Sequence, residues 1–492
     1  MEALDPEHAR LRAELAQLRA ENAELRRDRR LLTEQLAALA EVNRELRERV
    51  AELERRLSAN SRNSHQPPSS EGYAKPPPRS RRGRSGRKPG GQPGSPGATL
   101  RQVDDPHEVI THVPDRCGGC GRSLREAPVV STENRQVADV PELALRWVEH
   151  RLEHRACACG QVTMAGPGDG VPGGVHAPVQ YGPGVRAVAT YLVAAHHLPL
   201  DRAAAVMSDL LAAPVSPGSI SAWVAAAGER LAPFTDRVVD LLADAAVAHF
   251  DETGLRVDGR LAWVHAACTD RLTLYTCHDR RGREAMDAAR VLPAFTGIAV
   301  HDCWAPYFCY PMTHAICNAH VIRELVGVWE NTGQAWAAKL AATLERLNVA
   351  VLEAKLAGTP ALDAEVLAGW HARYDALVAA GRAANPEPEG GWRGKRPVAV
   401  NLLDRLGSLR ADILRFSVDF RVPFSNNAAE RDIRPVKIRE KISGCLRSLA
   451  GATTFCALRS YLSTTRKHGR DALTALRELH EGQPWLPEPA RC

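Results

Sequence analysis

The sequence predicts a multidomain α+β protein with an N-terminal parallel coiled coil, a four-cysteine zinc finger, a helical segment and an α/β domain of the ribonuclease H type. Three observations support this prediction. Leucine recurs every seven residues from Leu4 to Leu53, which is the heptad of a coiled coil. Two close cysteine pairs follow, at 117–120 and 157–159, as in tetrahedral zinc sites. Three strand patterns, a helix and another apolar strand then lie between residues 243 and 302.

Composition and charge narrow the function classes before any motif is considered. The chain has 64 Lys and Arg against 58 Asp and Glu, a net charge of +6, so a nucleic-acid partner must be argued from local charge. The longest apolar stretch without charge, residues 187–200, is too short and too polar to span a bilayer. Twelve cysteines in 492 residues are too few for a disulfide scaffold. We therefore expect a cytoplasmic protein with reduced thiols, no secretory signal and no membrane partner.

Residues 1–57 have the pattern of a leucine zipper. With leucine at position d of each heptad, Asn22 and Asn43 occupy a positions, which favours two parallel strands in one register. Glutamates at g positions would face arginines at e positions of a partner helix, and this pairing is attractive. We therefore expect a homodimer or higher homo-oligomer through this coiled coil. The alternative is one long helix packed on its own protein.

Residues 58–105 read as a basic linker that builds no core. Asn, Ser, Pro and Gly dominate it, and acids are absent between Glu71 and Asp104. A disordered arm of this composition suits sequence-independent contact with DNA phosphates, although a merely soluble tether remains the alternative. The candidate DNA-binding residues of this arm are Lys75, Arg79, Arg81, Arg82, Arg84, Arg87 and Lys88.

Residues 106–164 are predicted to form the zinc-finger domain. Cys117 and Cys120 form a Cys-Gly-Gly-Cys turn followed by glycine, and Cys157 and Cys159 form a Cys-Ala-Cys turn also followed by glycine. Each turn supplies two thiolates, and four thiolates complete a tetrahedral structural Zn²⁺ site. Free thiols or a redox pair are the alternative.

Residues 165–240 combine a Gly/Pro-rich hinge with a helical segment. Ser216 followed by Pro217 is a helix start, because serine caps a helix and proline fits its first turn. Two helices joined by a short turn resemble a DNA-binding helix-turn-helix, while an ordinary packed helical hairpin is equally compatible with the pattern.

Residues 241–445 read as the α/β domain. Three consecutive strands, a helix over about 283–294 and the apolar run GIAVHD give the beginning of a ribonuclease H-like sheet. An Ala- and Leu-rich helical insertion is expected over about 320–416, followed by a short helix around 426–434. Residues 446–492 are expected to be a basic helical tail.

Three acids of this domain are the candidate catalytic residues. Asp251 and Asp302 each end an apolar strand, and in a ribonuclease H-like sheet these strands are neighbours. Glu430 lies in a helix that Ser425 or Asn426 can cap and that Pro435 is expected to end. Three converging carboxylates can bind two Mg²⁺ ions, or Mn²⁺ in their place, for phosphodiester chemistry. The alternative is three unrelated surface acids.

Several neighbours of these acids are candidates for supporting roles. Asn426 and Arg434 lie four residues to either side of Glu430 and so share its helix face; Arg434 is expected to position DNA. Cys317 and His320 form Cys-x-x-His at a predicted helix start, with metal binding, active-site support and plain packing all open. Asn426 and Asn427 are expected to support the active site. Glu252→Gln and Asp432→Asn are expected to retain substantial activity if these two acids are not metal ligands.

The motifs FDETGLRV, HDCWAPYF, CNAHVIREL and FSNNAAERDIRPVKIREKISG, with the segments NSRN, PPSS, RKPGGQPG and CGGCG…CACG, resemble those of the IS66 family of bacterial insertion-sequence transposases. The resemblance covers residues 57 to 482. It implies a DDE transposase with a helical insertion between the second and third acids, and it assigns these acids to Asp251, Asp302 and Glu430. It also suggests small accessory transposition proteins as partners.

The predicted function is therefore DNA transposition by metal-dependent cleavage and strand transfer. Element terminal repeats and target DNA would be the partners, and the protein would be nucleoid-associated when bound to DNA. A structure-selective nuclease of the same fold is the alternative within the same chemistry. A dimeric zinc-containing DNA-binding regulator without catalysis is the alternative from another class, and it would need none of the three acids.

Overall fold

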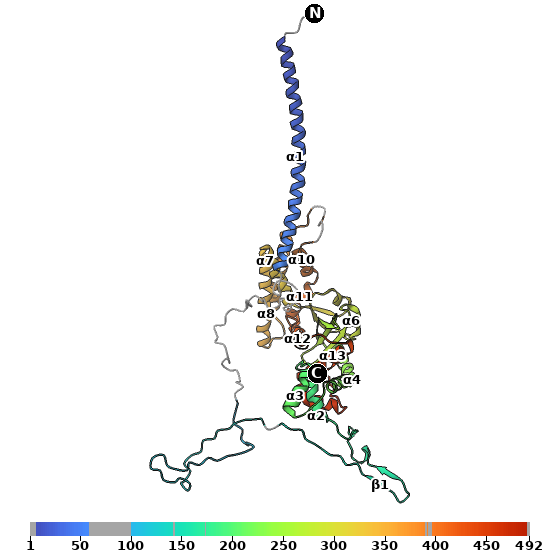
Figure 1. The fold of residues 1–492 in the computed structure, drawn as a ribbon. Coiled ribbons are helices and arrows are strands. Elements are labelled where there is room, and N and C mark those ends of the chain that lie inside the picture. Colours follow the sequence, from blue (N-terminus) through green and yellow to red (C-terminus); the bar gives the residue numbers. More distant parts are fainter. Residues whose placement is uncertain are drawn as a thin grey trace.

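The computed structural model describes residues 6–58, 100–140, 143–172, 174–388, 391 and 396–489. Figure 1 shows three parts: a long N-terminal helix, an extended segment that carries a small hairpin, and a body of helices around a central sheet. The seven arm residues named above as DNA-binding candidates, from Lys75 to Lys88, lie outside the described residues. Within the described ranges, no helix has the length and apolar character that a membrane span needs.

Helix α1 (Pro6–Ser58) is one continuous helix of 53 residues. Its Ala, Leu, Glu and Arg residues are strong helix formers, and its proline stands at the first helical position, where it is tolerated. The heptad leucines from Leu11 to Leu53 are between 49% and 67% exposed. This continuous apolar stripe is the surface that a partner helix would bury, so dimerisation stays a prediction of the heptad.

We expect a fragment of residues 1–60 to form a parallel dimer, because its exposed leucines gain burial only against a second copy. Replacing Asn22 and Asn43 by Leu should raise the stability of the dimer and loosen its register or oligomeric state. Analytical ultracentrifugation of the fragment at roughly tens of micromolar, a concentration at which such zippers associate, gives the test. A monomer at that concentration would contradict the prediction.

The segment that holds the cysteine pairs contains little regular structure. Strands β1 (His154–Ala156) and β2 (Val162–Met164) form an antiparallel hairpin whose turn carries Cys157 and Cys159. The Cys117 turn is closed by an isolated bridge between Arg116 and Ser123. All residues of β1 and β2 are exposed, so the hairpin has no apolar core of its own.

Four helices precede the sheet and pack with the C-terminal helices. The Ser216 hydroxyl accepts from the Ser219 amide at 3.1 Å, which is the predicted cap. Met207 and Ile220 are fully buried in the same small core. The helical DNA-binding role proposed for this segment remains a prediction. The helices are α2 (Pro183–Ala194), α3 (Leu200–Leu211), α4 (Pro217–Glu229) and α5 (Ala232–Ala243).

The central sheet has the order β5-β4-β3-β6-β7. β3 pairs antiparallel with β4, and β4 with β5, whereas β3–β6 and β6–β7 are parallel. Helix α6 (Arg283–Ala288) is shorter than predicted, since Arg290 adopts a left-handed conformation (φ 65°) soon after it. The strands are β3 (Val247–Val257), β4 (Arg260–Cys268), β5 (Thr273–His278), β6 (Ile298–His301) and β7 (Thr313–Ile316).

A helical insertion follows β7 and forms a second core with the parallel edge of the sheet. Val300 and Ile316 of the sheet lie in one apolar cluster with Leu344 and Leu406 of the insertion. The segment 398–416, predicted as helical, divides into two helices at Leu409. The helices are α7 (Asn318–Thr332), α8 (Ala335–Leu356), α9 (Ala364–Ala384), α10 (Val398–Ser408) and α11 (Arg410–Val418).

Helix α12 (Asn427–Ser443) corrects the sequence prediction, because it continues through Pro435 instead of ending there. Proline removes one N–H from the helix ladder, but the buried side chains of Ile433 and Val436 pack this stretch against β3. Burial of this face offsets the lost hydrogen bond.

The C-terminal residues form a layer on the sheet instead of a separate tail. Helix α13 (Leu449–Lys467) lies against β5, where the Ser460 hydroxyl accepts from the Tyr275 amide at 2.8 Å. Helix α14 (Ala472–His480) packs on α2. Leu458 and Leu476 of these helices belong to the main core with Phe234.

Candidate active site

Asp251, on β3, is level with Asp302, which directly follows the neighbouring parallel strand β6. β3 pairs with β6 in the register His249 to Val300, so Asp251 and Asp302 are each two residues beyond that pair. Side chains alternate along a strand. His249 contacts α12, so Asp251 points to the α12 side of the sheet. The two carboxylates therefore emerge level with each other, Asp251 from the middle of β3 and Asp302 directly after β6. The expectation that Asp251 ends its strand is wrong, because β3 continues to Val257.

Glu430 approaches this pair from the first turn of α12. Burial raises the pKa of Asp251 well above its ordinary value of 3.8, and the neighbouring carboxylates of Glu252, Asp302 and Glu430 raise it further. These charge interactions indicate that Glu252, Asp302 and Glu430 all lie near Asp251. Among the described residues, the oxygens of Asp251, Asp302 and Glu430 do not all lie within 4.8 Å of one another, so their action as one site remains a prediction. The three acids are half-buried, and carboxylate oxygens are the donors that hard divalent metal ions prefer.

We expect Asp251→Asn to stabilise the metal-free protein. A carboxyl whose pKa is raised on folding destabilises the folded state as pH rises above its unfolded value, because the charged form is disfavoured there. The variant should therefore unfold at a higher temperature in chelator at neutral pH, and the difference should shrink as pH falls toward 4. Thermal unfolding at several pH values checks this; a lower unfolding temperature for the variant at neutral pH would contradict it.

Asn426 fixes the start of α12, and Glu430 with it. It is only 2% exposed, and its side-chain amide donates to the Phe250 carbonyl at 2.7 Å while Oδ1 lies 2.8 Å from His249 Nδ1. Its backbone N–H donates to Cys317 Sγ at 3.1 Å, and its carbonyl accepts from the Glu430 amide. Asn426 holds the N-cap position without a side-chain cap, because its side chain is bound to β3 instead.

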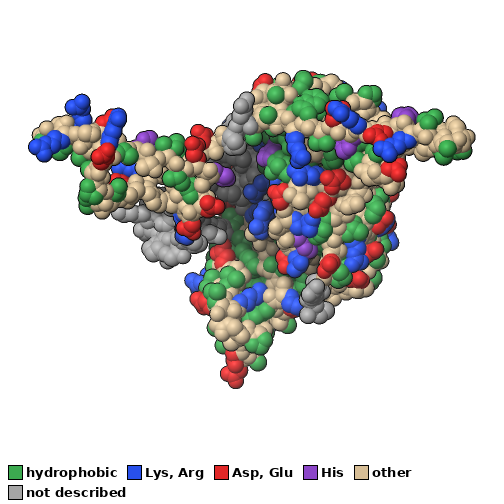
Figure 2. All heavy atoms as spheres, turned by 90° about the horizontal axis from the view of Figure 1, so that it is seen from below, with side chains coloured by type: hydrophobic (Ala, Val, Ile, Leu, Met, Phe, Trp, Pro, Cys, Tyr) green, Lys and Arg blue, Asp and Glu red, His purple; other side chains and the backbone are tan. Residues whose placement is uncertain are grey.

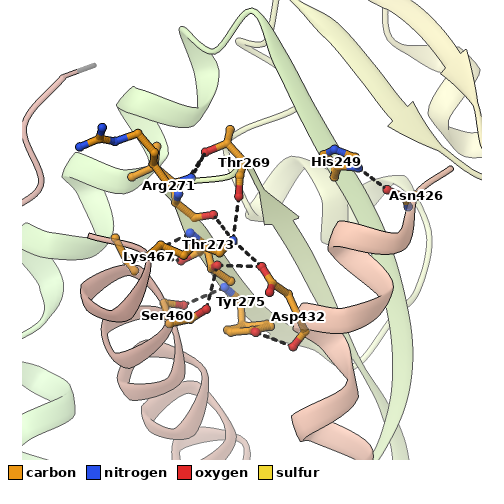
Figure 3. A network of polar contacts seen from close by, with 12 residues as sticks. His249, Thr269, Arg271, Thr273, Tyr275, Asn426, Asp432, Ser460 and Lys467 are labelled. Atoms are coloured by element: carbon orange, nitrogen blue, oxygen red, sulfur yellow. Dashed lines mark hydrogen bonds and ion pairs between the residues drawn. The ribbon is translucent and has the colours of Figure 1, made fainter. Parts of the chain in front are cut away.

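A second anchor lies two residues beyond Glu430. The Asp432 carboxylate accepts from the Thr273 hydroxyl at 2.8 Å and pairs with Lys467 at 2.6 Å, and the Tyr275 hydroxyl donates to its carbonyl. Figure 3 shows both anchors, with Asn426 bound to β3 and Asp432 bound to β5 and α13. Glu430 is thus placed by contacts on both sides of it. The Asp432 carboxylate joins three elements, and the expectation that Asp432→Asn retains substantial activity remains a prediction.

Cys317 and His320 lie beside Glu430. The Cys317 Sγ, a ring nitrogen of His320 and a carboxylate oxygen of Glu430 all lie within 4.8 Å of one another. Among the described residues, this is the one group of three or more His, Cys, Asp or Glu side chains close enough to hold a metal ion. His320 Nδ1 is 3.9 Å from Glu430, and Arg323 is 4.0 Å from its other oxygen. Burial raises the pKa of the Cys317 thiol to about 11, so it acts as a neutral acceptor for the Asn426 amide. The pair lies close enough to Glu430 for metal binding as well as for active-site support, so these two alternatives and plain packing all remain open.

Glu252 belongs to a different network, on the opposite face of β3. Its side chain is 2% exposed, pairs with Arg281 at 2.6 Å and accepts from the Tyr307 hydroxyl at 2.7 Å. Burial raises its pKa, and Asp302 adds to the effect. Removing one partner of a buried ion pair typically destabilises a protein. The expectation that Glu252→Gln retains substantial activity remains a prediction. The DRRG loop that supplies Arg281 has no sequence pattern that marks it as part of the site.

Arg434, the candidate for positioning DNA, and Asn427, a candidate for active-site support, are both exposed. Arg434 and Asn427 both lie on the surface of α12, so the structure gives Asn427 no place among the anchors. In Figure 2, Lys and Arg side chains are mixed with Asp and Glu on the face drawn, and several basic side chains lie beside a hollow near its centre. This face carries no single continuous basic patch.

Each cysteine pair forms its own tight turn. The Gly121 amide donates to the Cys117 carbonyl and the Gly160 amide to the Cys157 carbonyl, at 2.9 and 2.8 Å. Hydrogen bonds from Cys120 and from Cys159 lower the pKa of Cys117 and of Cys157. The described structure does not bring the two pairs within 4.8 Å of each other. The four-cysteine site therefore remains a prediction, supported by two turns that each present two sulfurs.

We expect purified protein to contain about one zinc per chain, bound by Cys117, Cys120, Cys157 and Cys159. Such sites contribute on the order of 10–16 kcal/mol to folding in small zinc modules, so zinc would draw the two turns together. Cys120→Ser should remove the zinc and leave the unfolding temperature of the catalytic part unchanged. Metal analysis of protein prepared in reductant without chelator checks this. Absence of zinc would refute the assignment.

Comparison with known families adds two matches. Residues 178–454, more than half of the chain, match the family model described as Transposase IS66 family. Residues 3–101 match a family of unknown function, DUF6444. No curated protein gave a match.

Proposed function

The chain belongs to the IS66 family of transposases, and on that basis we propose that it cleaves DNA at the ends of an insertion sequence and joins those ends to target DNA. One observation carries the proposal: Asp251 on β3 is level with Asp302, directly after the parallel strand β6, and the charges of Asp302 and of Glu430 on α12 both act on Asp251. The order β5-β4-β3-β6-β7, with three antiparallel strands followed by two parallel ones, supports a ribonuclease H-like catalytic domain.

The proposed cofactor is a pair of Mg²⁺ ions, which Mn²⁺ can replace. The donor set fits, because hard divalent cations prefer carboxylate oxygens. In the described part of the chain, the basic groups within 4.0 Å of these acids are His320, at 3.9 Å, and Arg323, at 4.0 Å, both beside Glu430. When bound, the ions would activate the attacking oxygen and stabilise the leaving oxygen of a phosphodiester. Asp251 and Asp302 would hold them from the sheet and Glu430 from the helix, while Asn426 and Asp432 keep that helix in place.

The remaining parts have proposed roles in DNA binding and assembly. The basic arm around Lys75 to Lys88 would add affinity for any DNA sequence, and Arg434 would position DNA at the active site. The zinc-binding region would help to engage element ends. The coiled coil would join two copies, as cutting two element ends requires, with accessory transposition proteins as further partners. The site of action would be the bacterial cytoplasm, at the nucleoid.

The proposal is tested by incubating the full-length protein with DNA that carries the flanking inverted repeats and with a target plasmid. In Mg²⁺ we expect nicks that leave a 3′-OH at the element end, followed by joined products. Chelator should prevent both reactions. A protein that binds the ends but never nicks them in Mg²⁺ or Mn²⁺ would favour a DNA-binding regulator, and cleavage without regard to the repeats would favour a structure-selective nuclease.

A further inference from the structure

The face of the sheet opposite Glu430 carries a connected polar network directly behind the candidate metal site. Arg281, in the loop between β5 and α6, directs Nη2 and Nε to one oxygen of Glu252, at 2.6 and 3.1 Å. The Tyr307 hydroxyl donates to the other oxygen at 2.7 Å. Glu252 directly follows Asp251 on β3, so this network is attached to the strand that carries the first catalytic acid.

The same network also holds the turn that carries Asp302. The Arg281 guanidinium lies 4.0 Å from the ring centre of Trp304 and 4.8 Å from that of Trp263. The Trp304 amide donates to Asp302 Oδ1 at 2.9 Å. In addition, the Tyr307 ring stacks on His301, the residue before Asp302, with ring centres 4.4 Å apart. Tyr307 and Trp304 therefore both fix the turn after β6.

We propose that Arg281 and Glu252 act as a positioning clamp that sets the separation of Asp251 and Asp302, and thereby the affinity of the site for divalent metal ions. The clamp binds β3 through Glu252 and the Asp302 turn through Trp304 and Tyr307. Neither Arg281 nor Glu252 faces the metal site, since Glu252 points to the other side of β3. This inference rests on the proposed function and names residues that the metal-ligand assignment leaves out.

The Glu252–Arg281 pair is largely shielded from solvent and held in one geometry. The Glu252 side chain is 2% exposed and the Arg281 side chain 38% exposed, so the carboxylate is buried and Arg281 lies between it and the solvent. A guanidinium stacked on two indoles loses little freedom when it binds a carboxylate. Groups that orient metal ligands in this indirect way typically change metal affinity by about 10–100-fold when they are removed.

The test is Mn²⁺ binding to the full-length protein, measured by calorimetry without DNA, alongside the Mg²⁺ dependence of nicking. For Arg281→Gln we expect Mn²⁺ affinity to fall by roughly tenfold or more, with a matching rise in the Mg²⁺ concentration for half-maximal nicking. Nicking at saturating Mg²⁺ should largely recover, because the ligands themselves remain. Arg281→Lys should recover part of the affinity. Tyr307→Phe removes one hydroxyl and should cause a smaller loss of Mn²⁺ affinity. This second variant still tests the clamp if Arg281→Gln does not fold.

The matched control is Arg410→Gln. Arg410 of α11 also makes two hydrogen bonds to a carboxylate, that of Asp375 in α9, at 2.6 and 2.9 Å, and is also 38% exposed, but it lies in the helical insertion. It should bind Mn²⁺ like the wild type.

Folded Arg281→Gln and Tyr307→Phe proteins with wild-type Mn²⁺ affinity would overturn the clamp, as would a wild type that binds no Mn²⁺. Wild-type protein that binds Mn²⁺ but never nicks DNA would instead refute the proposed function, and the calorimetric comparison would still decide on the clamp.

Discussion

Asp251→Asn and Asp302→Asn should each reduce cleavage of element-end DNA by on the order of a thousandfold or more. Each substitution keeps the shape of the side chain but removes one charge from the proposed ligand set. The metal ions contribute several kcal/mol to stabilising the transition state, and each 1.4 kcal/mol corresponds to a tenfold change in rate. Single-turnover nicking in Mg²⁺ measures the loss.

Two further readouts separate a catalytic defect from a folding defect. Both variants should bind element-end DNA in chelator as the wild type does, and neither should unfold at a lower temperature. Asp270→Asn, an exposed acid in the turn between β4 and β5, should cleave at the wild-type rate. If Asp251→Asn or Asp302→Asn retains more than about a tenth of the wild-type cleavage rate, the acid replaced in that variant is not a metal ligand.

Asn426→Leu should slow cleavage by roughly a hundredfold without changing the set of metal ligands. Leucine has a similar size but cannot bond His249 Nδ1 or the Phe250 carbonyl, so the start of α12 is released from β3. Displacement of a catalytic group by about 1 Å is enough for a loss of this size. Two buried groups left without partners should also cost about 1–3 kcal/mol each in the free energy of unfolding.

The expected signature of Asn426→Leu is a lower maximal rate with DNA-end binding preserved. Asn401→Leu provides the control, because Asn401 is an exposed asparagine on α10 in the insertion. It should leave both the rate and the unfolding temperature unchanged. A folded Asn426→Leu protein with the wild-type rate would show that Asn426 does not position Glu430.

The sequence pattern predicts the sheet face of the site better than its helix face. Apolar runs end at Asp251 and at Asp302, and both runs form neighbouring parallel strands that bring the two acids level with each other. The pattern does not show that β3 continues beyond Asp251 to Val257. Strand β7 could not be predicted in the same way. Its four residues, from Thr313 to Ile316, are too few to show alternation, and its pairing depends on β6.

The anchors of the site depend on contacts between distant segments. The local pattern predicts that the Asn426 side chain caps the helix. In the structure it instead donates a hydrogen bond to the Phe250 carbonyl of β3, a residue 176 positions away in the sequence. Pro435 reads as a helix end, and tertiary burial overrides that signal. Adjacent residues of a strand lie on opposite faces, so Glu252 points away from Asp251, but its partners Arg281 and Tyr307 come from distant segments that the sequence pattern does not connect with it. Local patterns carry no information on such pairings.

The most direct test of the account is the single-turnover cleavage rate of Glu430→Gln on element-end DNA in Mg²⁺. Glu430 comes from a helix far in sequence from both strands, so its participation shows that the three acids act as one site. We expect no cleavage above the chelator background, with wild-type end binding and an unfolding temperature at least equal to that of the wild type. Cleavage at the wild-type rate would contradict the account and move the third ligand elsewhere.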